Sequence, residues 1–344
     1  MHVRSLFAAL ALLCASGASA QTLEKVNISY QPGYWALPLH IAGEKGWWKE
    51  VGLDAKPVMF AAGAAQIAAV GAKSWDIGGM GIVPAILGNV RFDLKMVGLA
   101  TEEGGVNTLY ATGASAQKMK TPANWRGEKI LVTTNSNGDY IVQSCLKKAG
   151  LDKKDVQLVN MAPAQIVTTL AGGQANLGIT WAPHIYAIEK QIGGVPLCSG
   201  RDAGVFVPNV LVARSDYARE HPETVAKVLA VYLRGWSWAK AHPDEAREML
   251  RGFFQANGVY FDEDSLRREV AERTHYDLDD ELRLMGRGQA GASDADQWIR
   301  DVAGFMQANG SIPKVPEPAG WVTDEYLKQA KDDTALAGFA ARGD

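Results

Sequence analysis

The regular alternation of short apolar runs with helical patterns along residues 26–200 is the feature that most restricts the fold of this chain. Residues 26–30 have the composition of a strand, and residues 37–48 carry the apolar spacing of a helix. The same order repeats, with expected strands at 57–60, 76–80 and 94–100 and expected helices at 66–72 and 84–87. Strands and helices that alternate at this length indicate an α/β fold with mostly parallel strands.

The pattern restarts near residue 128. An expected strand at 128–134 leads through a turn at 135–138 into a helix that begins at Asp139 and ends before Gly150. Expected elements then follow at 156–160, 165–170, 176–180 and 184–190. Residues 60–78 and 161–178 run in near register about 100 residues apart, which favours two lobes of similar topology. The alternative is that two parallel α/β segments look alike because both obey the same packing rules.

The character of the chain changes after Asp202. A single strand is expected at 206–212, and from Ser215 onward the chain is almost wholly helical, with helix starts at Pro222 and Pro243. One strand followed by helices predicts that the chain returns to the first lobe, so that residues 21–110 and 210–344 form lobe 1 and residues 111–209 form lobe 2. Two crossings, near 109–112 and 207–212, would make a two-segment hinge suited to closure around a ligand.

Residues 1–20 have the pattern of a secretory signal: a basic start, an apolar run too short to span a bilayer, and small residues up to Ala20. We therefore expect an exported protein, periplasmic in a Gram-negative bacterium, of 324 residues and about two domains. Its net charge changes from −3 to −4, which argues against nucleic acid or an anionic membrane as partner. Cys145 and Cys198 remain in the same expected lobe, so a disulfide is geometrically possible.

Five loops stand before helices and are candidates for holding a ligand, because ligands of open α/β sheets bind at the carboxyl ends of strands. They lack lysine and arginine, but free N–H groups at a helix start bind anions without a formal charge. Trp35 and Trp181 could form the apolar sides of a pocket for a compact ligand. Taken singly, each loop is also explained as a tight turn. The candidate residues are Gly33, Tyr34, Trp35, Ala62, Gly63, Gly81, Ser136, Asn137, Trp181 and His184.

Sequence motifs of catalysis are missing. The loops do not pair a nucleophile with a histidine, and neither G-x-S-x-G nor a phosphate-binding lysine loop is found. Glu102 and Glu103 are adjacent in an extended segment, so their side chains should point to opposite faces. The histidines are not at metal-ligand spacing, and His184 is either a ligand donor or a capping residue. We expect a protein without catalytic residues, metal or cofactor.

Several short motifs carry a family resemblance. W-R-G-E-K-I at 125–130, W-A-P at 181–183 and A-I-E-K at 187–190 resemble periplasmic substrate-binding proteins of ABC transporters for sulfonates, taurine and nitrate. The resemblance covers nearly all of residues 26–250. It implies a type II periplasmic binding-protein fold, in which an anion is held between two α/β lobes. It also implies a monomer whose partners are a membrane permease and an ATPase.

Two positions depart from the taurine branch of that family. Taurine-type members carry carboxylates where this chain has Asn107 and Asn209, and an amide cannot neutralise a ligand's ammonium group. A sulfonate, a carboxylate or a similar small anion without an amine is therefore expected at least as strongly as taurine. Two other functions of the fold stay open: a sensory receptor that signals to a membrane kinase, and a thiamine-pyrimidine enzyme. The enzyme's cytosolic setting and cysteine-rich iron motif are absent here.

Overall fold

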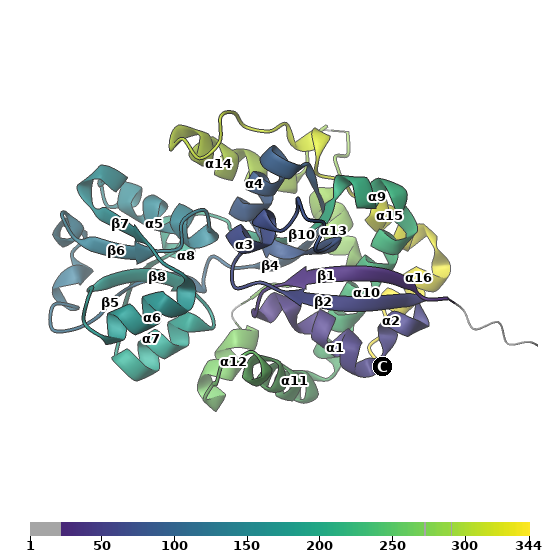
Figure 1. Cartoon of the computed structure of the whole chain (residues 1–344), viewed down its shortest axis with the longest axis horizontal. Helices are drawn as coiled ribbons and strands as arrows, with labels where there is room; N and C mark the ends of the chain where they lie inside the picture. Colours follow the sequence, from purple (N-terminus) through teal and green to yellow (C-terminus); the bar gives the residue numbers. More distant parts are fainter. Residues whose placement is uncertain (1–21, 272, 290) are drawn as a thin grey trace, which may run out of the picture.

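Two five-stranded sheets make up the frame of the computed structural model, which describes residues 22–271, 273–289 and 291–344 (Figure 1). The expected signal sequence lies outside the described residues. The first sheet has the order β2-β1-β3-β10-β4 and the second β7-β6-β8-β5-β9. The strands of the first sheet are β1 (Glu24–Tyr30), β2 (Leu53–Met59), β3 (Ile77–Gly81), β4 (Leu94–Glu102) and β10 (Pro208–Arg214). Those of the second are β5 (Asn107–Ala111), β6 (Lys129–Val132), β7 (Gln157–Asn160), β8 (Leu177–Trp181) and β9 (Val195–Ser199).

The two sheets share one topology. In each, four strands are parallel and one, β10 or β5, runs antiparallel to both neighbours. The antiparallel strand is the one that follows a passage of the chain from the other sheet. The expectation of two mostly parallel sheets is therefore confirmed, and the strand orders correspond position by position. This agrees with the near register of residues 60–78 and 161–178, although a shared topology does not distinguish duplication from common packing rules.

The passages between the sheets lie close to the expected crossings. β5 already begins at Asn107 and pairs with β8 and β9, so the first passage covers residues 103–106 and precedes the expected 109–112. The second covers residues 204–207, immediately before β10. Residues 107–110 therefore belong to the second sheet and residues 208–209 to the first, whereas the sequence-based boundaries placed them in lobe 1 and lobe 2, respectively. We use lobe 1 and lobe 2 below for the parts built on the first and second sheets. Their movement as units stays a prediction.

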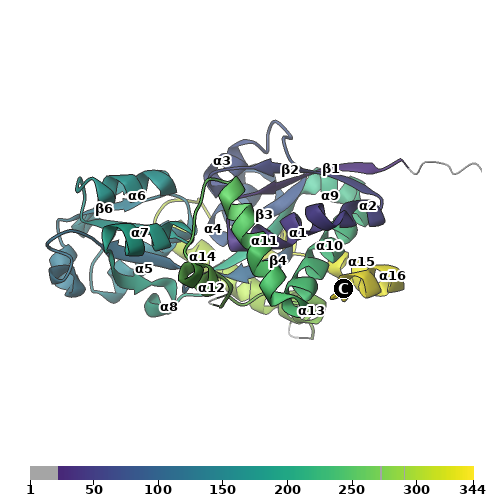
Figure 2. The ribbon, with the colours of Figure 1, turned by 90° about the horizontal axis from the view of Figure 1, so that it is seen from below.

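Helices cover both sheets (Figures 1 and 2). The helices from residue 34 to the first passage are η1 (Tyr34–Ala36), α1 (Leu37–Lys45), α2 (Trp47–Glu50), α3 (Gly63–Ala68) and α4 (Ile82–Phe92). Lobe 2 has η2 (Lys118–Lys120), η3 (Pro122–Trp125), α5 (Asn137–Lys148), η4 (Lys153–Asp155), α6 (Pro163–Ala171), α7 (His184–Ile192) and α8 (Gly200–Ala203). After β10 follow α9 (Ser215–Glu220), α10 (Pro222–Ala241), α11 (Pro243–Ala256), α12 (Glu263–Ala271), α13 (Leu278–Met285), α14 (Asp294–Ala308), η5 (Pro318–Gly320), α15 (Glu325–Asp332) and α16 (Thr334–Ala340).

The C-terminal part of the chain returns to lobe 1, as expected. β10 inserts between β3 and β4, and α10 packs against α1, α15 and α16. Val322 adds a single parallel bridge to Met96 at the edge of the first sheet. The tryptophans at 75, 238 and 321 are fully buried in the core of this lobe. In the described part of the chain, no helix combines the length and apolar character needed to cross a membrane.

Some elements differ from the expectation for local reasons. The helix expected at 37–48 is divided, because Gly46 adopts φ 74° and ends α1 before α2 begins. The helix expected at 66–72 lies earlier, over Gly63–Ala68. Strand β9 was not expected, and it contains Pro196. A proline cannot donate to a sheet ladder, so it is tolerated here because β9 is an edge strand.

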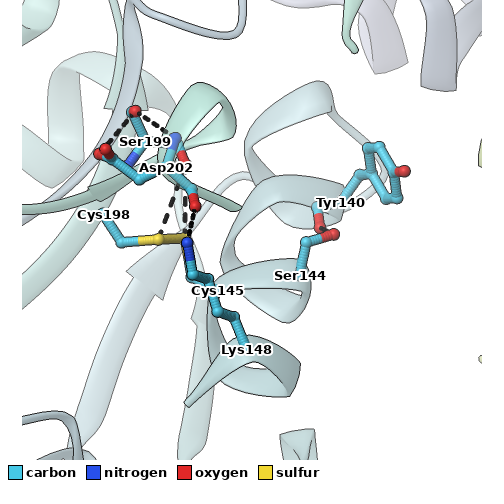
Figure 3. The surroundings of a disulfide bond; sticks show 7 residues. All are labelled: Tyr140, Ser144, Cys145, Lys148, Cys198, Ser199 and Asp202. Carbon is cyan, nitrogen blue, oxygen red and sulfur yellow. Dashed lines mark hydrogen bonds between the residues drawn. A yellow bond between two sulfur atoms is a disulfide. The ribbon is translucent and has the colours of Figure 1, made fainter. Parts of the chain in front are cut away.

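A disulfide joins Cys145 of α5 to Cys198 of β9, which confirms the bridge considered from the sequence (Figure 3). Their Cα atoms lie 6.2 Å apart, within the usual range. Next to it, the Ser199 hydroxyl caps α8 by accepting from the Asp202 N–H, and the Asp202 carboxylate accepts from Ser199 in return. The bridge thus attaches the edge strand and the start of α8 to α5.

Candidate ligand-binding site

A small cavity of about 40 Å³ lies where the carboxyl ends of strands from both sheets face each other. A cavity needs about 10–15 Å³ to hold one water molecule, so this one suits a compact ligand. The structure brings ten of the candidate residues together around it: Gly33, Tyr34, Trp35, Gly63, Gly81, Asn107, Ser136, Asn137, Trp181 and Asn209. Their contact with a ligand stays a prediction.

The two lobes touch directly at this cavity through Asn137, the first residue of α5. Its side-chain Oδ1 accepts a hydrogen bond from the backbone N–H of Val83 at 3.1 Å. Its Nδ2 donates to Oδ1 of Asn209 at 3.4 Å. A Cβ at Gly81 would stand 2.6 Å from the Asn137 side chain, so the absence of a side chain at 81 permits this approach. The structure therefore shows the lobes closed on each other.

Lobe 1 contributes a wall of aromatic side chains. Tyr34 and Trp35 are buried in the short helix η1, and the Tyr232 hydroxyl donates to the Trp35 carbonyl at 2.8 Å. The Trp35 ring packs against Gly79, where a Cβ would stand 2.2 Å from it. Burial raises the pKa of Tyr34, so its phenol stays neutral. Trp181 of lobe 2 is partly buried and lines the same cavity.

Gln66 fixes the loop beneath this wall, a role that the sequence did not indicate. It is fully buried, and its Nε2 donates to the Ser29 hydroxyl at 2.6 Å and to the Gly79 carbonyl at 3.0 Å. Its Oε1 accepts from Nε2 of Gln31 at 3.0 Å. One amide thereby ties β1, β3 and the loop at residues 31–33 together, and this loop carries Gly33 into the cavity.

A buried ion network, absent from the candidates, also reaches the cavity. Nε of Arg273 donates to the Glu103 carboxylate at 2.9 Å, and Nη1 lies 3.0 Å from the Glu269 carboxylate. Burial raises the pKa of Glu269. Burial alone would lower the pKa of Arg273, but the carboxylates of Glu103 and Glu269 raise it overall. Glu103 and Arg273 both line the cavity, and the guanidinium lies 5.3 Å from the Tyr34 ring centre.

The expectation that Glu102 and Glu103 point apart agrees with this geometry. Glu102 accepts from the backbone N–H of Gly104 at 2.6 Å, whereas Glu103 faces Arg273. The sequence offered no signal for the pairing with Arg273, because the partners are 170 residues apart. The loops before the helices do lack cations, yet a guanidinium enters the cavity from the segment after α12.

Ala62 and His184 do not line the cavity. Ala62 is the N-cap of α3, one residue before Gly63. His184 is the first residue of α7, and it lines a separate groove with residues 258–262 of the α11–α12 connection. The residues of this segment that line the cavity are Trp181, the last residue of β8, and Ala182, which follows it. Burial lowers the pKa of His184 to about 4, so the imidazole is neutral at physiological pH.

The connection between α11 and α12 joins the lobes on one side of the cavity. Phe261 packs edge-on against Phe254 of α11 and Tyr186 of α7, with ring centres 4.7 and 5.4 Å apart. Lys190 of α7 forms ion pairs with Asp262 at 3.5 Å and Asp264 at 3.1 Å. An aromatic stack and charged pairs therefore link lobe 2 to the base of α12.

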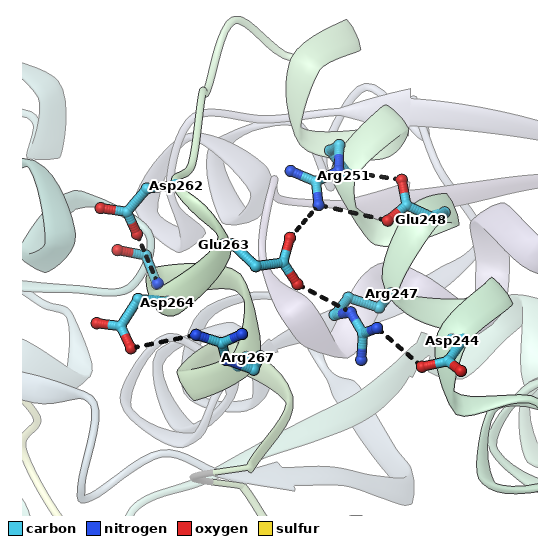
Figure 4. Close-up of polar contacts among 9 residues, drawn as sticks. Asp244, Arg247, Glu248, Arg251, Asp262, Glu263, Asp264 and Arg267 are labelled. Carbon is cyan, nitrogen blue, oxygen red and sulfur yellow. Dashed lines mark hydrogen bonds and ion pairs between the residues drawn. The ribbon is translucent and has the colours of Figure 1, made fainter.

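The base of α12 is in turn held to α11, and α14 closes the other side. Glu263 lies between Arg247 and Arg251 of α11, at 3.3 and 2.5 Å (Figure 4). In Figure 1, α14 is on the opposite side of the lobe junction from α12, and its Phe305 packs edge-on against Tyr140 of α5 at 4.8 Å. Contacts on both sides thus hold the closed arrangement.

Comparisons with known proteins agree with this architecture. A family model described as NMT1/THI5 like matches residues 36–246. A putative aliphatic sulfonates-binding protein of Bacillus subtilis is 24% identical over 331 residues, covering 94% of each chain. The taurine-binding periplasmic protein of Escherichia coli is 27% identical over 230 residues, covering 65% of this chain and 69% of its own. The crystal structure of the periplasmic aliphatic sulphonate binding protein SsuA from Escherichia coli superposes with a TM-score of 0.71 at 19% identity, covering 87% of this chain and 92% of SsuA.

Proposed function

Because this chain belongs to the NMT1/THI5-like family, we propose that it is an extracytoplasmic solute-binding protein that delivers a small organic anion to an ABC importer. The observation that carries the proposal is the closed cavity between the lobes, lined from both sheets at the carboxyl ends of their strands. The relatives named above are binding proteins for sulfonates and taurine, which supports binding over catalysis. The protein acts in the periplasm as a monomer, with a membrane permease and an ATPase as partners.

The start of α5 holds the anion in this proposal. Ser136 is the N-cap of this twelve-residue helix, and its hydroxyl accepts from the backbone N–H of Asp139. Asn137 and Gly138 are the first two residues of α5, so their backbone N–H groups have no acceptor within the helix. Such groups, with the positive end of the helix dipole, attract anions. The Arg273 charge is already balanced by Glu103 and Glu269, so the backbone donors supply the attraction.

Ligand binding should stabilise the fold measurably. A ligand present at 100 times its dissociation constant is expected to add about 2.7 kcal/mol to the free energy of unfolding. A thermal-shift screen of sulfonates, carboxylates, nitrate and sulfate on ligand-stripped protein checks this. Gly81→Ala should reduce the shift, because the new methyl group displaces Asn137. Gly304→Ala in α14, where a Cβ meets no atom within 4 Å, is the matched control. If no compound shifts the midpoint, the proposed ligand class is wrong.

Asn209 should select against ligands that carry an amine. Asn209→Asp keeps the acceptor that Asn137 uses but adds a buried negative charge, so affinity for a plain anion should fall by about 1–3 kcal/mol. Affinity for zwitterionic taurine should hold or improve. Calorimetry with ethanesulfonate and taurine on both proteins gives four affinities. The control is Asn176→Asp, which lies just before the start of β8 and therefore away from the cavity at the end of that strand. It should change neither ligand's affinity. Equal losses for both ligands would make Asn209 a hinge residue without a role in selection.

A further inference from the structure

The side chain of Asn107 leaves a hydrogen-bond acceptor unused at the cavity. Asn107 begins β5 directly after the first passage between the lobes, is 2% exposed and lines the cavity. Its Nδ2 donates to the Glu103 carbonyl at 3.0 Å. Within the residues that the structure describes, no donor reaches its Oδ1. The other cavity amides differ, since Oδ1 of Asn137 and Oδ1 of Asn209 each accept a hydrogen bond.

The orientation of this amide follows from its neighbour. A carbonyl oxygen can only accept, so the Asn107 atom that faces the Glu103 carbonyl must be the NH₂ group. The oxygen is therefore held on the other side and cannot exchange places with the nitrogen without losing a hydrogen bond. A buried acceptor without a donor is costly, and native proteins satisfy nearly all such groups. A donor on the bound ligand would satisfy this one.

The charges around the cavity distinguish between possible donors. The Glu103 carboxylate already accepts from the Thr101 hydroxyl and from Arg273, so its charge is compensated. An ammonium group would enter the same small cavity as the Arg273 guanidinium, where the one carboxylate among the lining residues, Glu103, is already paired with that guanidinium. The side chains at 107 and 209 are neutral amides and cannot balance a second positive charge. A hydroxyl group supplies one donor without a charge. It therefore fits the single free acceptor better than an amine does.

We propose that the ligand is a small anion that bears a hydroxyl group, and that this hydroxyl donates to Oδ1 of Asn107 while the anionic end faces the start of α5. The assignment rests on the proposed binding function and narrows its ligand class to short hydroxysulfonates or hydroxycarboxylates. Asn107 is then a specificity-determining residue. A site built to receive a donor rejects an analogue that lacks it, because the protein's polar group is left unpaired.

Two matched ligand series test the proposal on ligand-stripped protein by calorimetry. The first is ethanesulfonate, 2-hydroxyethanesulfonate and taurine, which differ only at the end away from the sulfonate. The second is acetate, glycolate and glycine. In the series that binds, the hydroxyl compound should bind at least tenfold more tightly than both the methyl and the amino compound. Equal affinity for the methyl and hydroxyl compounds, or tightest binding of the amino compound, would overturn the proposal while leaving anion binding intact.

A variant pair then assigns the preference to Asn107. Asn107→Leu, which keeps the branched shape of the side chain but is larger and has no acceptor, should bring the hydroxyl and methyl compounds to within about twofold of each other. Asn209→Leu should lower both affinities together and keep their ratio, because the oxygen at 209 already has a donor. A preference that persists in Asn107→Leu would overturn the assignment. Binding of none of the six compounds by the unmodified protein would instead contradict the proposed function itself.

Discussion

Replacing Arg273 with methionine is expected to lower the free energy of unfolding by about 3–5 kcal/mol, because it leaves the buried carboxylates of Glu103 and Glu269 without their cation. Methionine keeps much of the volume of the side chain, so the effect is mainly electrostatic. Urea unfolding at pH 7 measures it. The exposed pair of Arg283 and Asp280 provides the control, since Arg283→Met should cost less than about 1 kcal/mol.

The pH dependence of the Arg273→Met variant separates this cause from a loss of packing. Burial already raises the pKa of Glu269, and removal of the cation raises it further above its unfolded value. A raised folded pKa means that stability is retained at low pH and lost as pH rises through the folded value. The deficit should therefore shrink when unfolding is measured near pH 4 instead of pH 7. A deficit that is the same at both pH values would contradict the electrostatic explanation.

Neutralising the carboxylates provides the second check on Arg273. In a triple variant with Glu103→Gln and Glu269→Gln added to Arg273→Met, no buried charge is left unpaired, so most of the lost stability should return. A triple variant less stable than the single one would show that the network matters for its hydrogen bonds more than for its charge.

Most of the fold could be predicted from the sequence because the patterns that mark its strands and helix starts are local. Strand β1 alternates in burial over residues 25–28, and the proline-marked starts of α10 and α11 lie at Pro222 and Pro243, as the composition indicates. β9 was missed because Pro196 interrupts the usual strand signal. β5 was missed because all of its residues are buried, which removes the alternation of polar and apolar side chains.

Most of the candidate site could be predicted from the sequence because of the geometry of parallel sheets. The prediction missed the residues that act through partners distant in the chain. Loops after parallel strands meet at one edge of a sheet, so residues as distant as Gly33 and Trp181 could be placed together from the topology alone. Arg273 and Gln66 could not, because each acts through partners that no local pattern indicates. His184 lies outside the cavity although its helix begins where the sequence indicated, because it lines the groove next to the α11–α12 connection, which is distant in the chain.

The Cys145–Cys198 disulfide should have an effect of similar size to that of Arg273. It closes a loop with a sequence separation of 53, and the loss of chain entropy in the unfolded state predicts about 4 kcal/mol of stabilisation. The Cys145→Ala/Cys198→Ala double variant should lose this amount in urea unfolding relative to the oxidised protein. Reducing agent should lower the stability of the unmodified protein and leave that of the variant unchanged.

Two further measurements decide how this bridge acts. Thiol counting on unfolded, unreduced protein that begins at Gln21 should find no free thiol, and two free thiols would contradict the bridge. Ligand affinity of the double variant, measured at low temperature where it stays folded, should match that of the oxidised protein. The reason is that Cys145 lies two turns beyond the start of α5, and neither cysteine lines the cavity. A parallel loss of affinity and stability would show instead that the bridge holds the start of α5 in its binding position.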